Sequence, residues 1–399
     1  MPRVDGLKPG PAGRARRGAV CGVPRRVFGR PGRRPKTLTS VLAAGDHARM
    51  SDSSDGATGT TARQARALAG HGLFLITAAA RAPSVHNTQP WRFRVGPGAV
   101  ELWSDPRRKL RGADPSGREM LISCGAALFG LRLAIRSLGY LPVTELLPDP
   151  ARLRLMARVS AGAAAPMSGL ERQMLDAVPH RHTHRGPFAP GPLPRGLLAG
   201  LQHDALAEGA TLALVTGGLA YDRLERIAAA AARRGDLSPR ARADIRRWTR
   251  TAASMARDGI PATALASRTG HPPGRLPQRD FDLGRALARL PSGGAPPSAT
   301  AVLLTPGDRR ADWLRAGQAL YRLLLHAASQ RVFASLHTQP LEDTTTRNLI
   351  TAELALPGHP QMVLQLGPAT TASPTARQVP GEPDALSVGR TGGGRVRAW

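Results

Sequence analysis

The chain has 399 residues, 41% of them hydrophobic, and a formal net charge of +28, which allows one large or two ordinary domains with a substantial core. A charge of this size is typical of nucleic-acid binding. However, lysine occurs only at Lys8, Lys36 and Lys109, so the charge is almost all arginine, as a GC-rich coding bias would produce. Two cysteines, Cys21 and Cys124, are too few for a disulfide framework or a cysteine metal site. With no run of about 20 apolar residues to span a bilayer, these features favour a cytoplasmic protein.

The first part of the chain predicts a disordered extension followed by a compact unit. Residues 1–60 are rich in Arg, Gly, Pro and Ser and have no apolar periodicity. The unit after them, residues 61–168, shows helical and alternating apolar patterns. The expected elements are a helix over 62–81, a hairpin of strands 91–95 and 100–103, a helix over 116–138 and a strand over 152–159.

The second part, residues 169–370, partly repeats this pattern. Between its elements, residues 236–298 contain a helical piece at 241–259 and then Pro, Gly and Ser, which indicates an insertion folded over the surface as a lid. Residues 371–399 are expected to be a flexible tail. The elements expected in this part are helices over 169–178, 220–234, 308–330 and 344–355 and strands over 210–216, 300–305 and 361–367.

Two near-repeats indicate an internal duplication. Gly125 to Leu133 and Gly317 to Leu325 both follow the pattern G-x-A-L-aromatic-x-L-x-L, and SVHNTQP (84–90) is echoed by SLHTQP (335–340). Small residues on a helix stripe let two helices approach closely, so the matched pair predicts a central helix–helix interface. The alternative is a coincidence between two leucine-rich helices.

The segment from Ala82 to Phe93, APSVHNTQPWRF, is the strongest local signal. A helix must end near Pro83, because the residue before a proline is disfavoured in the helical conformation. The irregular loop that follows is dense in amide and hydroxyl groups, which can serve both edges of a flat heterocycle. From composition alone, a capped turn with a buried Trp91 is equally possible.

This segment resembles the signature loop of the nitroreductase superfamily, where the loop borders a flavin mononucleotide (FMN). Arg181, His182 and Thr183 resemble the triplet that holds the flavin in that superfamily, and residues 358–367 resemble its last core strand. HNTQPWRF, ISCGAAL, Thr183 to Phe188, ADWLRAG and TQPLE together resemble the Acg-like branch over about residues 62–368. The resemblance implies an α+β fold of the nitroreductase type, with two tandem related halves forming an internal pseudo-dimer.

The resemblance also implies a flavin site and a function. Only the first half has the full S-x-x-N-x-Q-P loop and only the second has the Arg-His-Thr triplet, which favours one FMN site shared between the halves. The expected contacts of the flavin are Ser84, Asn87, Thr88, Gln89, Pro90, Arg181, His182, Thr183, Arg185, Thr338 and Gln339. Arg181 and Arg185 are candidates for the phosphate, and the loop 335–340 for a backbone N–H near flavin N5. Arg377 lies where relatives place another phosphate-binding arginine, but its surroundings depart from their pattern.

The function expected is that of an FMN-dependent NAD(P)H oxidoreductase that reduces nitroaromatic or quinone-like acceptors, with no catalytic side chain. The alternative is a protein that sequesters FMN beneath the lid. The partners are FMN, NAD(P)H and a small acceptor, in a monomeric pseudo-dimer or a homodimer. His180, His182 and His184 alternate and could share a face for zinc, but no carboxylate or cysteine stands near them in the sequence, and no metal is expected. Cys124 fits a core position better than a nucleophile.

Overall fold

The computed structural model describes residues 58–265, 274, 276–287, 294–369 and 375–378, all of which belong to the compact unit 50–399. The predicted disorder of residues 1–60 therefore concerns residues that lie outside this description, except for the first turn of helix α2. The same holds for the predicted tail 371–399, apart from residues 375–378, and for parts of the predicted insertion.

The first sheet is built from a hairpin and two later strands in the order β1-β2-β4-β3, all antiparallel. The hairpin was predicted correctly, whereas β3 was not predicted at all. Its residues alternate between half-buried and exposed, as expected for a sheet with one face in water. The elements are α2 (Thr58–Gly70), α3 (Gly72–Ala80), β1 (Trp91–Gly96), β2 (Ala99–Ser104), α4 (Arg118–Ser137), β3 (Tyr140–Leu146) and β4 (Leu155–Ala164).

The single helix predicted over 62–81 is two helices. The chain breaks at His71, between Gly70 and Gly72, where helix propensity is low. A Cβ on Gly72 would lie 3.1 Å from a methyl carbon of Val95, so the close approach of α3 to the hairpin favours glycine here.

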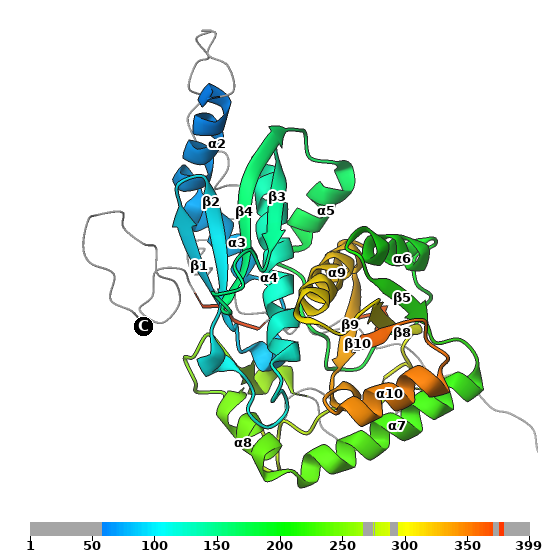
Figure 1. Cartoon of the computed structure of the whole chain (residues 1–399). Helices are drawn as coiled ribbons and strands as arrows, with labels where there is room; N and C mark the ends of the chain where they lie inside the picture. The colour runs from blue at the N-terminus through cyan, green and yellow to red at the C-terminus, as the bar shows by residue number, and fades with distance from the viewer. Residues whose placement is uncertain (1–57, 266–273, 275, 288–293, 370–374, 379–399) are drawn as a thin grey trace, which may run out of the picture. The chain divides into compact units, whose positions relative to one another are not determined.

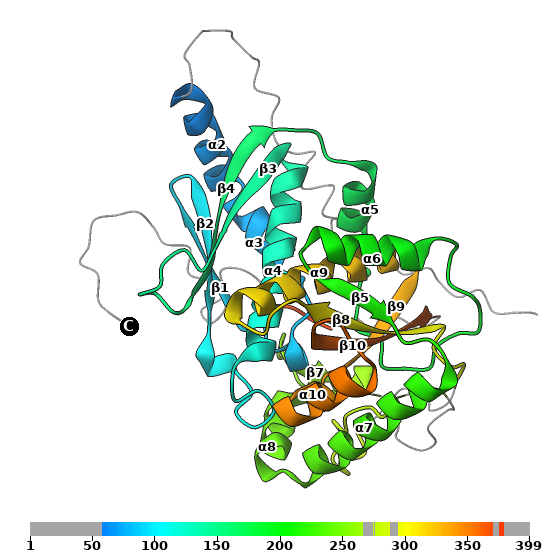
Figure 2. The same cartoon turned by 45° about the vertical axis from the view of Figure 1, so that its right-hand side comes forward.

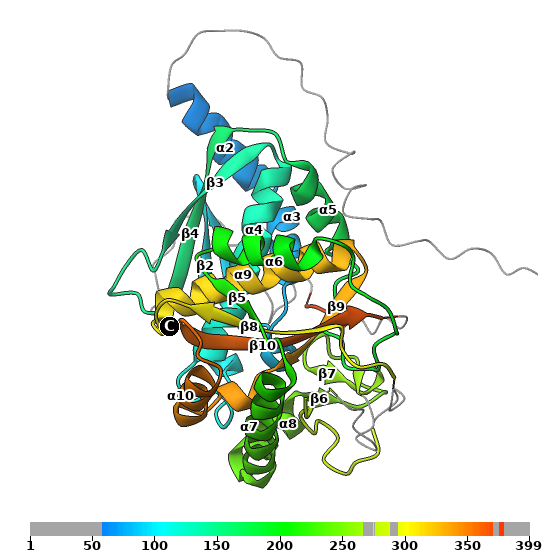
Figure 3. The ribbon, with the colours of Figure 1, turned by 90° about the vertical axis from the view of Figure 1, so that its right-hand side faces the viewer.

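The second sheet has the order β5-β8-β10-β9, again all antiparallel. Figures 2 and 3 show it between helices, with α6 and α9 on one face and α7 and α10 on the other. Because both faces are covered, β8 is a nearly continuous buried apolar run. The elements are α5 (Gly169–Ala177), α6 (Leu197–Ala207), β5 (Thr211–Leu214), α7 (Gly218–Leu237), α8 (Pro239–Trp248), β8 (Ala299–Thr305), α9 (Arg310–Ser329), β9 (Val332–His337), α10 (Thr344–Glu353) and β10 (His359–Pro368).

Three elements of this part differ from the sequence prediction. Helix α6 was missed, and the segment 335–340 expected to be a loop begins as the end of β9 before a short 3-10 helix, η4 (Gln339–Leu341). The helical piece expected over 241–259 ends at Trp248, after which the minimal strands β6 (Thr249–Arg250) and β7 (Ile260–Pro261) pair in parallel.

Helices α4 and α9 pack against each other between the two sheets (Figure 1). At their crossing Gly125 faces the backbone of Leu314, and Gly317 faces the backbone of Ile122. A Cβ at either glycine would overlap a carbonyl oxygen of the other helix. The predicted close helix–helix interface is therefore confirmed.

The two sheets share one connectivity. In each, a long helix joins the second strand to the third, and the fourth strand lies between the second and the third: β1-β2-β4-β3 and β5-β8-β10-β9. Gly125 and Gly317 each occupy the eighth position of a 20-residue helix. This is the arrangement that an internal duplication would produce.

Among the described residues, one helix is long and apolar enough to cross a membrane by length and composition, namely α4. The expectation that the sequence has no apolar run of this length is therefore wrong for α4 by this criterion. Of the apolar stretch of α4 that meets this criterion, 83% is buried inside the protein, as in the core helix of a globular domain.

Candidate functional site

The loop that follows α3 has an unusual backbone. His86, Asn87 and Gln89 have positive φ angles of 45°, 54° and 50°, a conformation that costs free energy for residues other than glycine. Ser84 holds the loop together, because its Oγ accepts a hydrogen bond of 2.9 Å from the backbone N–H of Gln89. The loop is tied to α4 by a 3.1 Å bond from the Val85 N–H to Ser123 Oγ. Such strained, well-supported loops are concentrated at functional sites.

A cavity lies beside this loop, with about 880 Å³ of empty space, part of it continuous with solvent. Its walls come from both sequence halves: the loop after α3, the first half of α4, the segment 183–185, α9, the end of β9 with η4, and residues 277–281 of the predicted insertion. Its polar walls include Ser84, Glu119, Thr183, Arg185, Arg279, Ser335, Thr338 and Gln339. Segments far apart in the sequence thus converge on one site of ligand size.

Five of the eleven predicted site residues line this cavity. They are Ser84, Thr183, Arg185, Thr338 and Gln339. His182 and Thr183 lie beside β9, where Thr183 forms a bridge with Ala334 and His182 stacks on Phe333 at 4.4 Å.

The other predicted residues of the loop do not line the cavity. Thr88 is fully buried, and the Pro90 carbonyl accepts a 3.4 Å hydrogen bond from Cys124 Sγ. The Asn87 amide donates to the Gly259 carbonyl at 2.8 Å, and the Gln89 amide donates to the Arg257 carbonyl at 2.9 Å. Their contact with a flavin stays a prediction, because these amides already fasten the insertion to the loop.

A group of buried arginines lies next to the cavity. The Arg181 guanidinium stands 5.7 Å from the ring of Tyr321, and Arg377 Nε donates to the Ala82 carbonyl at 3.1 Å. Burial, reinforced by the neighbouring charge of Arg181, lowers the pKa of Arg377 to about 9 and that of Arg185 to about 10. Burial also lowers the pKa of Arg181. Within the described ranges, no carboxylate forms an ion pair with Arg181 or Arg377, so this group is suited to an anion.

Glu119, in the first turn of α4, is a buried acid in the cavity wall. Burial, which the charge of Arg118 only partly offsets, raises the pKa of Glu119 to about 7. Its Oε2 has no hydrogen-bond partner among the described residues. Burial likewise raises the pKa of Asp114 to about 6, although Asp114 accepts hydrogen bonds from the backbone N–H groups of Met120 and Glu119. Glu119 could not be identified from residue patterns, because an acid in a first helical turn is favourable there without any functional role.

His86 is a second buried titratable residue in the cavity wall. Burial, with the charges of Arg279 and Arg185, holds the pKa of His86 well below its ordinary value. Neither ring nitrogen has a partner in the described part of the chain. Its ring meets that of Phe281 edge to face, with 5.0 Å between centroids. Its buried position was not expected from a loop that looked polar throughout.

The described part of the predicted insertion covers the cavity. Pro277, Gln278, Arg279 and Phe281 contribute to its wall, and Arg279 forms a buried ion pair with Glu342. Burial lowers the pKa of Arg279 to about 10 against the opposing charge of Glu119. A tertiary contact of this kind, between residues 63 positions apart, has no signal in a single sequence.

The structure also shows the surroundings of Cys124 and of two of the three alternating histidines. Cys124 is fully buried in α4, and burial raises its thiol pKa far above the ordinary value, so the predicted core role is confirmed. His182 and His184 each place a ring nitrogen near a backbone carbonyl, at 3.1 and 2.9 Å. The described residues contain no group of three side chains placed to hold a metal ion.

Comparison with known proteins finds relatives that match this chain over most of their own length. No family model matches the chain. The chain is 34% identical over 297 residues to "Putative NAD(P)H nitroreductase Rv3131" of Mycobacterium tuberculosis (strain ATCC 25618 / H37Rv), covering 73% of this chain and 83% of that protein. It is 30% identical over 295 residues to "Putative NAD(P)H nitroreductase acg" of the same strain, covering 73% and 87%.

A solved nitroreductase from Bacteroides fragilis, with bound FMN, superposes on 54% of this chain and 98% of its own, at 13% identity and a TM-score of 0.32. A score this low does not establish a common fold, so the assignment depends on the sequence relatives. Because the match to the first relative exceeds 30% identity and covers more than two thirds of that protein, the chain belongs to the nitroreductase family that these mycobacterial proteins represent.

Proposed function

We propose that the protein is an FMN-dependent NAD(P)H oxidoreductase of the nitroreductase type, which reduces nitroaromatic or quinone-like acceptors. The observation that supports this most directly is the cavity between α4, α9 and the strained loop 84–90, with buried arginines beside it. The names of the relatives, which describe NAD(P)H nitroreductases, support the same activity.

The residues present fit FMN in charge. The phosphate of FMN carries nearly two negative charges, and buried guanidiniums without carboxylate partners are costly unless an anion compensates them. Arg181 and Arg377 meet this description within the described residues. They would hold the phosphate. Arg377, which the sequence pattern left doubtful, thereby becomes a candidate on the strength of its burial beside Arg181.

The cavity residues fit the remainder of the cofactor. Ser84, Thr183, Thr338 and Gln339 would offer hydroxyl and amide groups to the ribityl chain and ring edges. Arg185, half-buried in the cavity wall, would favour negative charge on the bound ring. We retain Asn87, Thr88, Gln89, Pro90 and His182 as residues that shape the loop wall.

In the proposed mechanism, bound FMN would supply the chemistry, by taking up a hydride from NAD(P)H and passing electrons to the acceptor. The chain's own residues would bind and orient the cofactor, and they would exclude water from it. Phe281 and the neutral ring of His86 form an apolar contact over the cavity, which would keep water from the reacting atoms. No side chain need act as a nucleophile, and Cys124, buried in α4, is not available as one.

We propose one cofactor per chain, between two halves that comprise residues 61–168 and 169–370. The strained loop comes from the first half, and Arg181, Thr183 and Arg185 come from the second. The shared strand order of the two sheets supports the duplication. A flavin-to-protein ratio measured by absorbance should be one, and a ratio of two would contradict the shared site.

A second candidate function is the sequestration of FMN. The contacts of the insertion favour it, since Arg279 pairs with Glu342 and Phe281 packs on His86 over the cavity. If these contacts persist, they would restrict the access of NAD(P)H and of an acceptor to the flavin.

Anaerobic mixing of the purified protein with NADPH or NADH separates the two functions. Loss of flavin absorbance on mixing supports the oxidoreductase. A flavin that resists both nicotinamides but is reduced by dithionite supports sequestration. A colourless protein that takes up no added FMN would exclude both.

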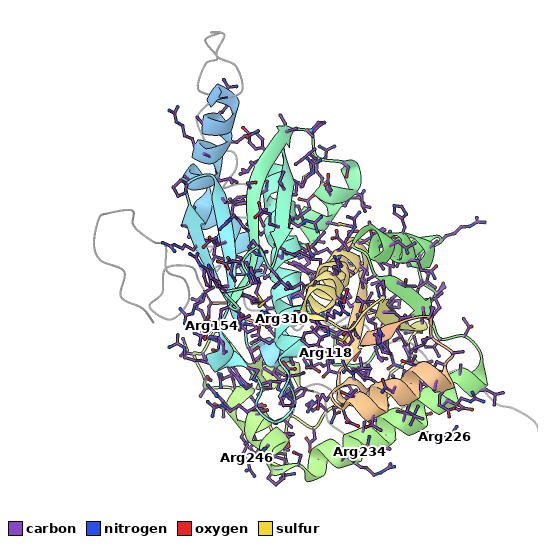
Figure 4. The ribbon with its side chains drawn as sticks, in the orientation of Figure 1. Arg118, Arg154, Arg226, Arg234, Arg246 and Arg310 are labelled. Atoms are coloured by element: carbon purple, nitrogen blue, oxygen red, sulfur yellow. The ribbon has the colours of Figure 1, made fainter. Side chains whose placement is uncertain are left out.

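Substitution at the phosphate site tests the proposed binding mode. Arg377→Gln should weaken FMN binding by about tenfold or more, because a charge-assisted contact is lost, while riboflavin binding should change little. Arg226→Gln, at an exposed arginine of α7 labelled in Figure 4, removes the same charge and is the control. Equal losses for FMN and riboflavin would remove Arg377 from the phosphate site.

A further inference from the structure

A second cleft lies next to the loop 84–90, where Arg108 in its wall bonds to the Thr88 carbonyl. Its walls are Arg92 of β1, Arg107 and Arg108 of the 3-10 helix η2 (Pro106–Arg108), Arg247 and Trp248 at the end of α8, Arg250 of β6, and the carboxylates of Asp105 and Asp258. The empty space, part of it open to solvent, is about 630 Å³. None of these residues lines the proposed flavin cavity.

The charges of the cleft are unbalanced. Five arginines face two aspartates, which leaves three positive charges. Each carboxylate already serves two guanidiniums: Asp105 pairs with Arg92 and Arg107 at 2.9 and 3.3 Å, and Asp258 pairs with Arg108 and Arg250 at 3.0 and 2.6 Å. Neither of these two acids forms an ion pair with the fifth arginine.

Arg247 is that fifth arginine. Its Nη2 donates to the Arg107 carbonyl at 3.2 Å, and no carboxylate of the described chain pairs with it. Like-charged guanidiniums held together repel each other, and this repulsion is relieved by an anion that accepts from several of them at once.

Trp248 keeps the guanidiniums together. The ring has guanidinium carbons of Arg247, Arg250 and Arg108 at 5.3, 5.7 and 5.9 Å from its centroid, within the range of cation–π attraction. The ring is itself buried, with 4% of its surface exposed. Its buried Nε1–H has no acceptor among the described residues, which is one more unsatisfied donor in the wall.

The cleft is connected to the strained loop through residues 257–259. Asp258 is held by the cleft arginines, while its neighbours bond to the loop: the Gly259 N–H donates to the Asn87 carbonyl at 3.1 Å, and the Arg257 carbonyl accepts from Gln89. Arg108 also donates to the Thr88 carbonyl at 2.9 Å. Whatever orders these arginines will order the loop as well.

We propose that this cleft, lined by Arg107, Arg108, Arg247 and Arg250, binds a phosphate group, either free or as the terminal phosphate of a small phosphorylated metabolite. A phosphate dianion offers oxygens to several guanidinium forks at once and compensates most of the excess charge. Its binding holds residues 257–259 on the loop 84–90. The site is independent of the proposed FMN site and does not rest on the proposed function.

The test uses the purified full chain, freed of unbound FMN and titrated calorimetrically with inorganic phosphate and, separately, with ADP. The informative variant is Arg107→Gln with Arg247→Gln, since both side chains are exposed and their loss should not prevent folding. Arg226→Gln with Arg246→Gln is the matched control, because both arginines are exposed, lie on α7 and α8 (Figure 4) and stand outside the cleft.

We expect saturable binding at one site per chain, weakened about tenfold or more in the first variant, unchanged in the control, and accompanied by a saturable rise in Tm. ADP binding tighter than phosphate identifies a nucleotide as the source, and equal affinities identify the phosphate group itself. No binding of either probe overturns the proposal. Binding that both variants weaken equally, or that Arg181→Gln abolishes, also overturns the proposal. The same holds if only a polyanion such as single-stranded DNA binds.

Discussion

At the scale of single residues, Glu119 links the site to stability. Its pKa of about 7 in the folded protein exceeds the ordinary value of 4.5, so the folded chain keeps a proton that the unfolded chain has lost between these pH values. The contribution of Glu119 to the free energy of unfolding therefore falls as the pH rises from about 4.5 to about 7. Asp114, with a pKa of about 6, acts in the same direction over a lower window.

Glu119→Gln tests this linkage, because glutamine keeps the shape of the protonated acid. At pH 8 the variant should unfold at a higher urea concentration than the wild type, with a free energy of unfolding that is larger by up to about 3 kcal/mol. At pH 4.5 the two proteins should unfold at nearly the same urea concentration. A difference that does not change with pH would show that Glu119 does not titrate as described.

The helix crossing offers a second test at this scale. Gly125→Ala and Gly317→Ala each place a methyl group against a carbonyl of the opposite helix, and the expected cost is about 1–3 kcal/mol or more in the free energy of unfolding. Gly169→Ala, at a helix position with nothing within 4 Å, is the control and should have little effect. Equal melting temperatures for all three variants would contradict the close approach of the helices.

At the scale of elements, we propose that the covering segment 277–281, which contributes to the cavity wall, controls access to the cavity. Arg279→Gln removes the charge that pairs with Glu342, and the loss of one partner from a buried ion pair costs about 3–5 kcal/mol. The variant should release FMN at least tenfold faster, measured by stopped-flow fluorescence. If the segment also excludes nicotinamide, NADPH should bleach this variant faster than the wild type.

Arg285→Gln is the matched control for the covering segment. Its side chain is exposed and bonds only to backbone carbonyls of its own turn, at Phe281 and Asp282, so its flavin release should match the wild type. Unchanged release from Arg279→Gln would mean that this ion pair does not close the site.

The elements that the sequence predicted are those whose pattern is local. The hairpin 91–104, the long helices α4 and α9 and the strand β10 follow from apolar periodicity and from the turn between the hairpin strands. Helix α6 was missed because the apolar residues that make up most of its sequence have no strong helical period. Strand β9 was missed because its six residues show no strict alternation of apolar and polar types. The sequence VFASLH of β9 contains β-branched and aromatic residues that could have indicated a strand.

At the scale of the whole molecule, the two sheets share a core through α4 and α9. Most residues of α4 are buried, and much of the surface of this helix packs on α9. Because neither half can bury its central helix without the other, thermal unfolding of the described unit should follow a single transition, with the same midpoint by near-UV and far-UV circular dichroism.

Residues 58–168 expressed without the rest of the chain provide the corresponding test. This segment should be insoluble or should bind the dye ANS, because the α9-facing surface of α4 is then exposed. A soluble segment with a cooperative unfolding transition would show that the two halves are independent.

The sequence by itself determined the family, the order of most helices and strands, and the loop and triplet that mark the site, because these depend on residue types at short spacing. Only the tertiary structure decided that Asn87 and Gln89 bond to the insertion, and that Arg377 lies buried beside Arg181. It also placed Glu119 and His86 as buried titratable groups in the cavity wall and brought five arginines to one cleft. The reason is physical: burial and charge compensation depend on which distant segments pack together, and local residue patterns do not specify this.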